Sequence, residues 1–474
     1  EAGPTAALQG PRLALRWSAE GLEDFKFYSR FSEGGLRPAA GWPGARGLAG
    51  ELWVGRDGGR LRLDSQTGEL RFAELFRGPL PFHSLQGEAF WRIGADGWIL
   101  EAPELAVANR DGRARARLRL IGDGQGSPFI DLRAQLLDGN AAGTSRYLPV
   151  TKMPASVVGW LDAAGFRGRI PQADLVLFGR TKNFPFADGS GVFDVQAKVS
   201  NLRLAYRQDW PALYGGEGRL RCFANSMEAQ VERGRIAGAG IQRAQVRIDQ
   251  LGKAPLVFAG EARGSGDQLL GFLRDSPLGN SIREQLTGMQ LSGTHGVSVR
   301  AAVPLRPGER AQVERGVRLE RGSYSVPRWG LQLDALEGTV RFTERGLAAE
   351  QVTARYRGLP AVLSAQTTGG GADERIAILA QLQAAPRQLL DGLASPWLHG
   401  RTDWEVQLLL PGFQAPRPAG TPAVELRVAS QLEGIVVELP APLGKSAAEA
   451  RALRLSVPFA ASGPGPVRLA YGDE

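Results

Sequence analysis

The feature that most constrains this chain's fold is a strict alternation of arginine with small or apolar residues between positions 113 and 120. The arginines are Arg113, Arg115, Arg117 and Arg119, and the residues between them are Ala114, Ala116, Leu118 and Leu120. Successive side chains of a β-strand point to opposite faces of its sheet. The spacing therefore predicts a strand with one charged face and one apolar face.

The same period of two recurs far along the chain, in the segments 11–17, 59–64, 201–206, 244–249 and 424–430. Buried parallel sheets read instead as continuous apolar runs separated by helices, and no such pattern is found here. The recurrence favours a mainly β fold, a long, curved antiparallel sheet with a few short helices. Further apolar-face positions predicted in this way are Leu202, Leu204, Val246, Ile248, Val424, Leu426 and Val428.

Turn signals separate many of these strands. Asp57-Gly58, Asp96-Gly97, Asp111-Gly112 and Glu337-Gly338 place a glycine where a tight hairpin needs a positive φ. Strands joined by short hairpins pair with their neighbours in sequence. The predicted topology is therefore an antiparallel meander.

Three segments have helical spacing: 154–165, 266–286 and 385–398. Asp267 is a plausible N-cap for the second. The second and third contain similar sequences, QLLGFLRDSPL and QLLDGLASPWL, and each is followed by predicted strands. We therefore divide the chain into an N-terminal meander, 1–146, and three helix-plus-strands repeats, 147–265, 266–384 and 385–474.

Composition argues against several classes of function. The net charge is +8, but the basic residues are spread along strands instead of forming runs, so we predict no nucleic-acid partner. Cys222 is the only cysteine, and the three histidines lie far apart, so we predict neither a disulfide nor a metal site. We found no phosphate-binding or nucleophile motif. We predict a protein that is not an enzyme, has no catalytic residues and binds no cofactor.

The chain has no run of 18 or more apolar residues, so we predict no membrane-spanning helix within it. Neither end carries the signature of a leader or of a finished domain. We therefore expect both ends to be internal to a longer protein.

Several segments resemble AsmA-like proteins of the YhdP type. They are YLPVTKMPASVVGWLDAAGFRGRIPQADLVLFGRTKNFPFADGSGVFDV (147–195), LAYRQDWPAL (204–213), GWILEAPELAVANRDG (97–112), LDALEGTVRFTERGL (333–347) and LPAPLGKSA (439–447). The resemblance implies a periplasmic protein, tethered to the inner membrane of a Gram-negative bacterium by an N-terminal anchor that this chain lacks. It further implies that phospholipid moves towards the outer membrane along a continuous β-groove.

The last of these segments contains Pro440, Pro442 and Lys445, which match an LPxPLxK element of the family. Two prolines within three residues restrict the backbone strongly. We predict a rigid turn at a sheet edge.

An apolar sheet face must be covered by a second sheet, by helices or by a ligand. Helical sequence amounts to only about a tenth of the chain, which is too little to cover so many strands. The residues alone leave two solutions open, a sheet that closes on itself or an open groove filled by acyl chains, and the resemblance favours the groove.

We therefore predict phospholipid acyl chains as the ligand, with the inner membrane and outer-membrane components as further partners. The predicted groove lining is Ala114, Ala116, Leu118, Leu120, Leu202, Leu204, Val246, Ile248, Val424, Leu426 and Val428. The alternative is a structural β-array that binds protein partners in envelope biogenesis without carrying lipid. That alternative predicts a closed, dry core.

Overall fold

Antiparallel strands dominate the computed structural model, with 67% of the chain in strands and 9% in helices. The structure describes residues 3–38, 42–72, 75–124, 126–276, 288–305, 311–327, 330–343, 346–369, 374–389, 396–412, 424–460 and 463–472. The mainly β fold, an open antiparallel sheet with a few short helices, is confirmed.

Contacts divide the chain into two units. The N-terminal unit comprises Glu1–Ile236, Arg243–Phe258 and Val303–Glu309, and the C-terminal unit comprises Ala237–Gln242, Ala259–Ala302 and Arg310–Glu474. Two strands, β15 (Ala239–Ile248) and β16 (Leu256–Ser265), are divided between the units, and β18 (Thr294–Val303) contributes its last residue, Val303, to the N-terminal unit. The division into four segments beginning at 1, 147, 266 and 385 stays a prediction.

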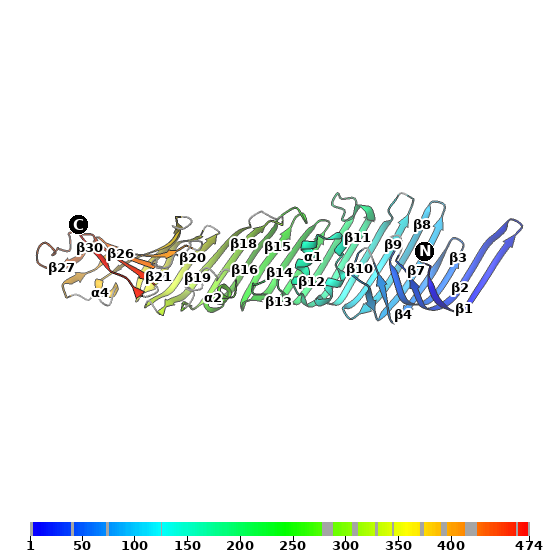
Figure 1. The fold of residues 1–474 in the computed structure, drawn as a ribbon, viewed down its shortest axis with the longest axis horizontal. Coiled ribbons are helices and arrows are strands. Elements are labelled where there is room, and N and C mark those ends of the chain that lie inside the picture. The colour runs from blue at the N-terminus through cyan, green and yellow to red at the C-terminus, as the bar shows by residue number, and fades with distance from the viewer. Residues whose placement is uncertain are drawn as a thin grey trace. The chain divides into compact units, whose positions relative to one another are not determined.

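The N-terminal unit is a meander whose strands lie side by side in chain order (Figure 1). Its strands are β1 (Thr5–Ser18), β2 (Gly21–Leu36), β3 (Gly44–Gly55), β4 (Gly58–Ser65), β5 (Gly68–Arg71), β6 (Leu80–Phe82), β7 (Ser84–Gly94), β8 (Gly97–Asn109), β9 (Gly112–Gly122), β10 (Phe129–Asn140), β11 (Arg167–Arg180), β12 (Val192–Leu204), β13 (Leu213–Phe223) and β14 (Ser226–Ile236). The pairing runs β1-β2-β3-β4-β7-β8-β9-β10-β11-β12-β13-β14, all antiparallel. The short β5–β6 hairpin pairs with β3.

The C-terminal unit repeats this plan. Its strands are β17 (Gln290–Leu291), β18 (Thr294–Val303), β19 (Gln312–Val326), β20 (Leu331–Thr343), β21 (Gly346–Tyr356), β22 (Leu359–Thr368), β23 (Arg375–Ala384), β24 (Leu398–Gly400), β25 (Thr402–Pro411), β26 (Val424–Ser430), β27 (Ile435–Val437), β28 (Leu453–Ala460), β29 (Gly463–Pro464) and β30 (Arg468–Tyr471). Strands β18 to β23 pair in chain order, and β23 continues through β25, β26 and β28 to β30. Strands β24 and β27 form a separate two-stranded ribbon.

The helices are short. They are η1 (Ala141–Tyr147), η2 (Val150–Lys152), α1 (Ala155–Ala163), η3 (Thr181–Asn183), α2 (Gly266–Arg274) and α4 (Pro386–Leu389). Each of the three predicted helical segments contains one of the α-helices. The remainder of the second segment from 277 to 286, and residues 390–395 of the third, lie outside the described residues. None of the helices in the described ranges is long and apolar enough to cross a membrane.

The prediction of Asp267 as the N-cap of α2 is wrong, because Ser265 occupies that position. The Ser265 hydroxyl accepts a hydrogen bond from the Gln268 amide at 3.3 Å, and the Gln268 side chain accepts one from the Ser265 amide at 2.9 Å. This reciprocal pair satisfies two amide groups at once, whereas Asp267 lies within the first turn.

The predicted turn at Glu337-Gly338 is also wrong, whereas hairpins form at Asp57-Gly58, Asp96-Gly97 and Asp111-Gly112. Gly338 lies inside β20, where the register shifts on both sides of Glu337. A Cβ at Gly338 would approach the Val352 Cα to 2.9 Å, so the glycine allows a bulged strand to lie against β21.

A buried carboxylate fastens η1 to the turn between β8 and β9. Asp111 accepts two hydrogen bonds from the Arg146 guanidinium and one, at 3.0 Å, from the Tyr147 hydroxyl. Burial raises the pKa of the Asp111 carboxyl, but these hydrogen bonds outweigh it, and the pKa lies below its ordinary value. The negative charge therefore holds the segment that leads from β10 towards α1.

We expect Asp111→Asn to weaken this attachment by about 1.5–3 kcal/mol, because the Arg146 guanidinium loses its buried counter-charge. Native-state hydrogen exchange of the η1 amides measures the loss. The matched control, Asp123→Asn, breaks the more exposed Asp123–Arg180 ion pair and should cost below about 1 kcal/mol. Equal protection of η1 in the two variants would contradict this account.

Candidate functional site

The apolar side of β9 is the starting point for the site. Ala114, Ala116, Leu118 and Leu120 are all half-buried, whereas the four arginines between them are exposed. In an antiparallel sheet, directly paired residues point to the same face. The face to which each neighbouring strand contributes can therefore be read from the register.

Across the strands, this register builds unbroken apolar rows. One row passes through Ala116 and crosses eleven strands from β2 to β14 without a charged residue. Its members are Phe31, Gly50, Leu63, Gly87, Leu105, Ala116, Ala134, Leu175, Val195, Cys222 and Met227.

A second row passes through Leu120 and extends to the edge strand β1. Its members are Leu13, Phe27, Val54, Gly59, Trp91, Leu100, Leu120, Ile130 and Gly179. Four such rows, from Ala114 to Leu120, give a strip about 20 Å wide at ~3.3 Å per residue. We call this surface the apolar face.

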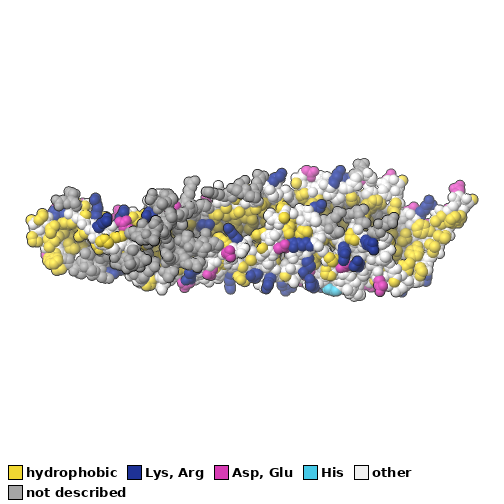
Figure 2. All heavy atoms as spheres, viewed as in Figure 1, with side chains coloured by type: hydrophobic (Ala, Val, Ile, Leu, Met, Phe, Trp, Pro, Cys, Tyr) yellow, Lys and Arg dark blue, Asp and Glu magenta, His cyan; other side chains and the backbone are white. Residues whose placement is uncertain are grey.

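Much of this face is uncovered at its N-terminal edge. Figure 2 shows hydrophobic side chains gathered over β1 and its neighbours, where Leu13 is 61% and Trp17 71% exposed. Both residues belong to the alternation that predicted β1. Apolar surface left in water is costly, about 25 cal/mol per Å².

The sheet curls towards the apolar face in the N-terminal unit. Trp42 lies beside the start of β3, and Trp98 lies near the start of β8, at the opposite ends of the antiparallel strands. A flat strand of this length would separate those ends by about 35 Å, yet the two indole rings lie 5.3 Å apart. Trp98 pairs with Gly122 in register with the apolar rows, so the concave side here is the apolar one.

The opposite face is polar and its charges are largely paired. Arg119 contacts Glu101 at 3.1 Å, and Arg221 contacts Asp194 at 2.8 Å. The hydrogen bonds from Arg221 outweigh partial burial and keep the pKa of Asp194 below its ordinary value. The arginines that alternate with the apolar residues therefore form a solvated outer wall.

The other predicted lining residues lie in different surroundings. Leu202 and Leu204, which pair with Gly216 and Leu213, are half-buried. Val246 is half-buried and Ile248 is buried, on the same side of β15. Thus burial alternates along β9 and along residues 245–248 of β15, whereas on β12 Arg203 is half-buried like the two leucines beside it.

The lining residues on β26 are covered by the chain itself. Val428 is 4% exposed and lies in a hydrophobic cluster with Leu432, Ile435 and Val437, and Leu426 packs against that cluster. Val424 is also buried. The apolar face of the C-terminal unit is thus filled by protein where it crosses β26. That these eleven residues contact lipid stays a prediction.

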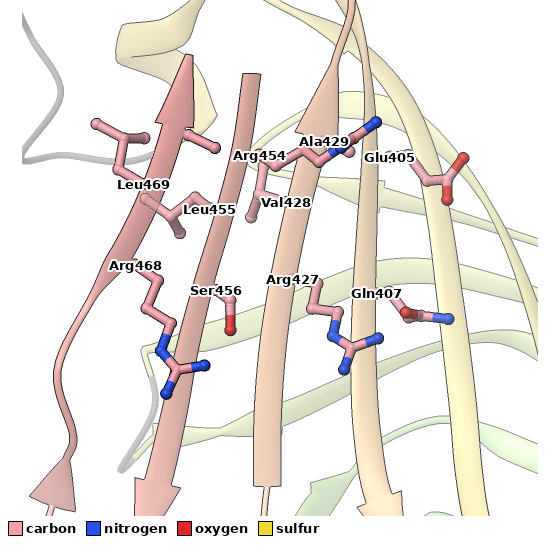
Figure 3. Close-up of a pocket in the computed structure, with 11 residues that line it drawn as sticks. Glu405, Gln407, Arg427, Val428, Ala429, Arg454, Leu455, Ser456, Arg468 and Leu469 are labelled. Carbon is pink, nitrogen blue, oxygen red and sulfur yellow. The ribbon is translucent and has the colours of Figure 1, made fainter. Parts of the chain in front are cut away.

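A cavity of about 360 Å³ lies over the same strands on the polar face (Figure 3). Gln407, Arg427, Ser456 and Arg468 form a row across β25, β26, β28 and β30 in direct register. Arg427 is neutralised by Glu425 at 2.9 Å. The lining also includes Val428, Leu455 and Leu469, so the cavity combines polar and apolar side chains.

The described residues include no group of three or more His, Cys, Asp or Glu side chains placed to hold a metal ion. Cys222, half-buried in the eleven-strand row, has its pKa raised by burial. The arrangement suits binding of an extended apolar ligand.

Sequence reasoning missed residues that complete the face, among them Trp91, Leu100, Leu132 and Leu175. Strands β8, β10 and β11 carry apolar residues on both faces, so a period of two does not reveal which side is which. Their pairing with β9 settles it. The segment covering Val428 was missed as well, although Lys445 within it was noticed.

We expect the covered and uncovered parts of the face to respond differently to truncation. Ile435→Ala, at a fully buried position, should cost about 2–5 kcal/mol. Leu118→Ala, at a half-buried position, should cost about 1 kcal/mol or less. Local opening energies from hydrogen exchange measure both, and equal losses would mean that Leu118 is packed as tightly as Ile435.

Comparison with known proteins gives one family and one curated relative. The family model described as "YhdP protein" matches residues 1–474. The relative is the intermembrane phospholipid transporter YhdP of Escherichia coli (strain K12), 23% identical over 447 residues, which are 94% of this chain. The match spans 35% of that relative's length. No solved structure matches.

Proposed function

The chain belongs to the YhdP family, and from this premise we propose that its apolar face holds phospholipid acyl chains during transport between the inner and outer membranes. The observation that carries the proposal is the eleven-strand row through Ala116, which holds no charged residue and lies on the concave side of a curled sheet. The name of the Escherichia coli relative supplies the cargo class.

The apolar face needs a cover that excludes water. Continuous rows of leucine, phenylalanine and tryptophan side chains are stable in water only when an apolar partner covers them. An acyl chain does so without needing hydrogen bonds, and its headgroup remains at the solvated mouth. The arginine-rich outer wall keeps the assembly in water.

The match spans 35% of the length of the Escherichia coli relative, so we place this chain within a longer transport path. We propose that the longer protein is periplasmic, tethered to the inner membrane by an N-terminal anchor, and that it reaches outer-membrane components. The chain described here would be one stretch of the bridge, with no catalytic step. Lipid identity, direction and driving force belong to the complete protein.

The alternative is a β-array that binds protein partners and carries no lipid. The dry cluster around Val428 favours it for that part of the molecule, because a closed core is what such an array requires. Mass spectrometry of the gently purified chain separates the two, since only a lipid carrier should retain phospholipid.

A photocrosslinking amino acid at Leu118 or Leu120 should capture phospholipid in cells, because both side chains lie in apolar rows. The matched positions are Arg117 and Arg119, adjacent on the same strand but on the polar face. If lipid adducts form as often at the arginine positions as at the leucine positions, the proposal that acyl chains lie on the apolar face is refuted.

Leu118→Asp and Leu204→Asp should block transport in the full-length protein, because an ionised carboxylate on the apolar face costs several kcal/mol to desolvate against acyl chains. Arg119→Asp places the same charge on the polar face and should leave most of the transport intact. Circular dichroism and protease resistance of each variant establish that it folds. Normal transport by folded Leu118→Asp and Leu204→Asp proteins would refute the proposal.

A further inference from the structure

The apolar face of the C-terminal unit carries an internal cover, which we call the plug. It consists of residues 432–445, which include β27, together with β24. Figure 1 shows α4 and β27 beside β26 and β30 at the end of this unit. The plug is the part of the described chain that lies where the sequence predicted lipid.

The plug packs directly on the apolar face. Val428 is in register with Val406 and Leu455, which continue one apolar row across β25, β26 and β28. Leu432 and Ile435 pack into the cluster that contains Val428, and Ile435 is fully buried. The chain itself thus occupies the position that acyl chains would take.

The plug does not belong to the sheet's hydrogen-bond ladder. Within the described residues, β24 pairs with β27 through Leu398–Val437, His399–Val436 and Gly400–Ile435, and Val437 forms a further bridge with Lys445, which also belongs to the plug. Strand β25 meanwhile keeps β23 and β26 as its partners. Withdrawal of the plug would therefore expose apolar surface but break no rung of the sheet.

Lys445 holds the plug together from inside. Its Nζ donates hydrogen bonds to the carbonyl oxygens of Leu432 at 2.8 Å, Ile435 at 2.6 Å and Ser446 at 2.9 Å, and the residue is 6% exposed. Desolvation lowers its pKa. All three acceptors are backbone carbonyls, so the ammonium fixes the shape of the loop, and the prediction of a rigid edge turn does not include this role.

Hydrogen bonds join the plug to its surroundings at its first residue and along its margin. The Leu432 amide donates to the hydroxyl of Ser430 in β26 at 3.0 Å. The Tyr471 hydroxyl donates to the Leu443 carbonyl at 2.8 Å, and Arg451, from the segment before β28, donates to the Pro442 carbonyl at 2.7 Å. The outer side of the plug region is itself apolar, because Trp397, Leu439 and Leu443 are largely exposed. An apolar outer side of this kind is suited to contact with lipid.

We propose that the plug is a displaceable occupant of the lipid path, which fills the apolar face at β25–β28 and yields to acyl chains, with Lys445 as the positioning residue that preserves its closed form. This rests on the proposed function, since lipid is the competitor. Plug and lipid share one surface, so their occupancies exclude each other. The N-terminal rows, by contrast, remain open to lipid.

The test measures thiol access in the 474-residue chain. Cys222 lies in an apolar row, so it is first replaced by serine, and single cysteines are then placed at Val428 or at Leu118. The probe is a phospholipid with a maleimide on its acyl chain, in vesicles of phosphatidylethanolamine and phosphatidylglycerol. We expect the Val428→Cys thiol to react at least about tenfold more slowly than the Leu118→Cys thiol, because the plug must open first.

Lys445→Met removes the donor but keeps the length of the side chain. It should raise labelling at Val428→Cys by about tenfold, leave labelling at Leu118→Cys unchanged, and be rescued by Lys445→Arg. The matched control is Arg454→Met, which removes a cation from the polar face of β28 and should change neither rate. If Lys445→Met fails to fold, Tyr471→Phe is the second variant. It removes only the hydrogen bond to the Leu443 carbonyl and should also raise labelling at Val428→Cys.

Each outcome decides something. Equal labelling of the two thiols in the chain with an intact plug would overturn the plug proposal and leave the lipid function standing. If neither Lys445→Met nor Tyr471→Phe raises the labelling of Val428→Cys, the plug proposal is likewise overturned. No labelling at Leu118→Cys or Val428→Cys in any variant would overturn both the plug and the proposed function.

Discussion

The rest of the structure depends on a constraint of antiparallel pairing: residues that face each other across two strands point to the same side. Once β9 alternates arginine with alanine and leucine, β8 and β10 must place their apolar residues opposite Ala114 to Leu120 or bury charge against them. Leu100, Leu118 and Leu132 show that they do so. A slip of one residue would reverse both faces, so the rows themselves specify the register.

The same constraint explains why the two units finish their apolar faces differently. A face built from rows has no natural partner within a meander, because neighbouring strands pair edge to edge and leave both faces of the sheet uncovered. The N-terminal unit curls until Trp42 meets Trp98, whereas the C-terminal unit returns residues 432–445 onto β25–β28. Both arrangements reduce the apolar surface that faces water. The N-terminal unit does so by curvature, and the C-terminal unit by covering the face with a segment of its own chain.

Whether a feature could be predicted from the sequence depends on how far apart along the chain its interacting residues lie. Alternation is local, so the two-faced strands, their antiparallel pairing and hairpins such as Asp111-Gly112 were predicted correctly. The capping box of Ser265 and Gln268 is local too, and was overlooked in favour of Asp267. The bulge at Gly338 is not a local feature, because it arises from the close approach of Val352 on another strand. Likewise, the partners of Lys445 and the cover over Val428 arise from a fold-back that no periodicity records.

The rows also change what length means for such a molecule. In a protein built around a closed core, an inserted element must fit a volume that is already full. Here a new hairpin needs only two strands that keep the alternation, and it would extend every row by about 10 Å at ~4.8 Å per strand without altering the cross-section. Gain or loss of hairpins would thus change the length of the sheet in steps of two strands while its two faces stay the same.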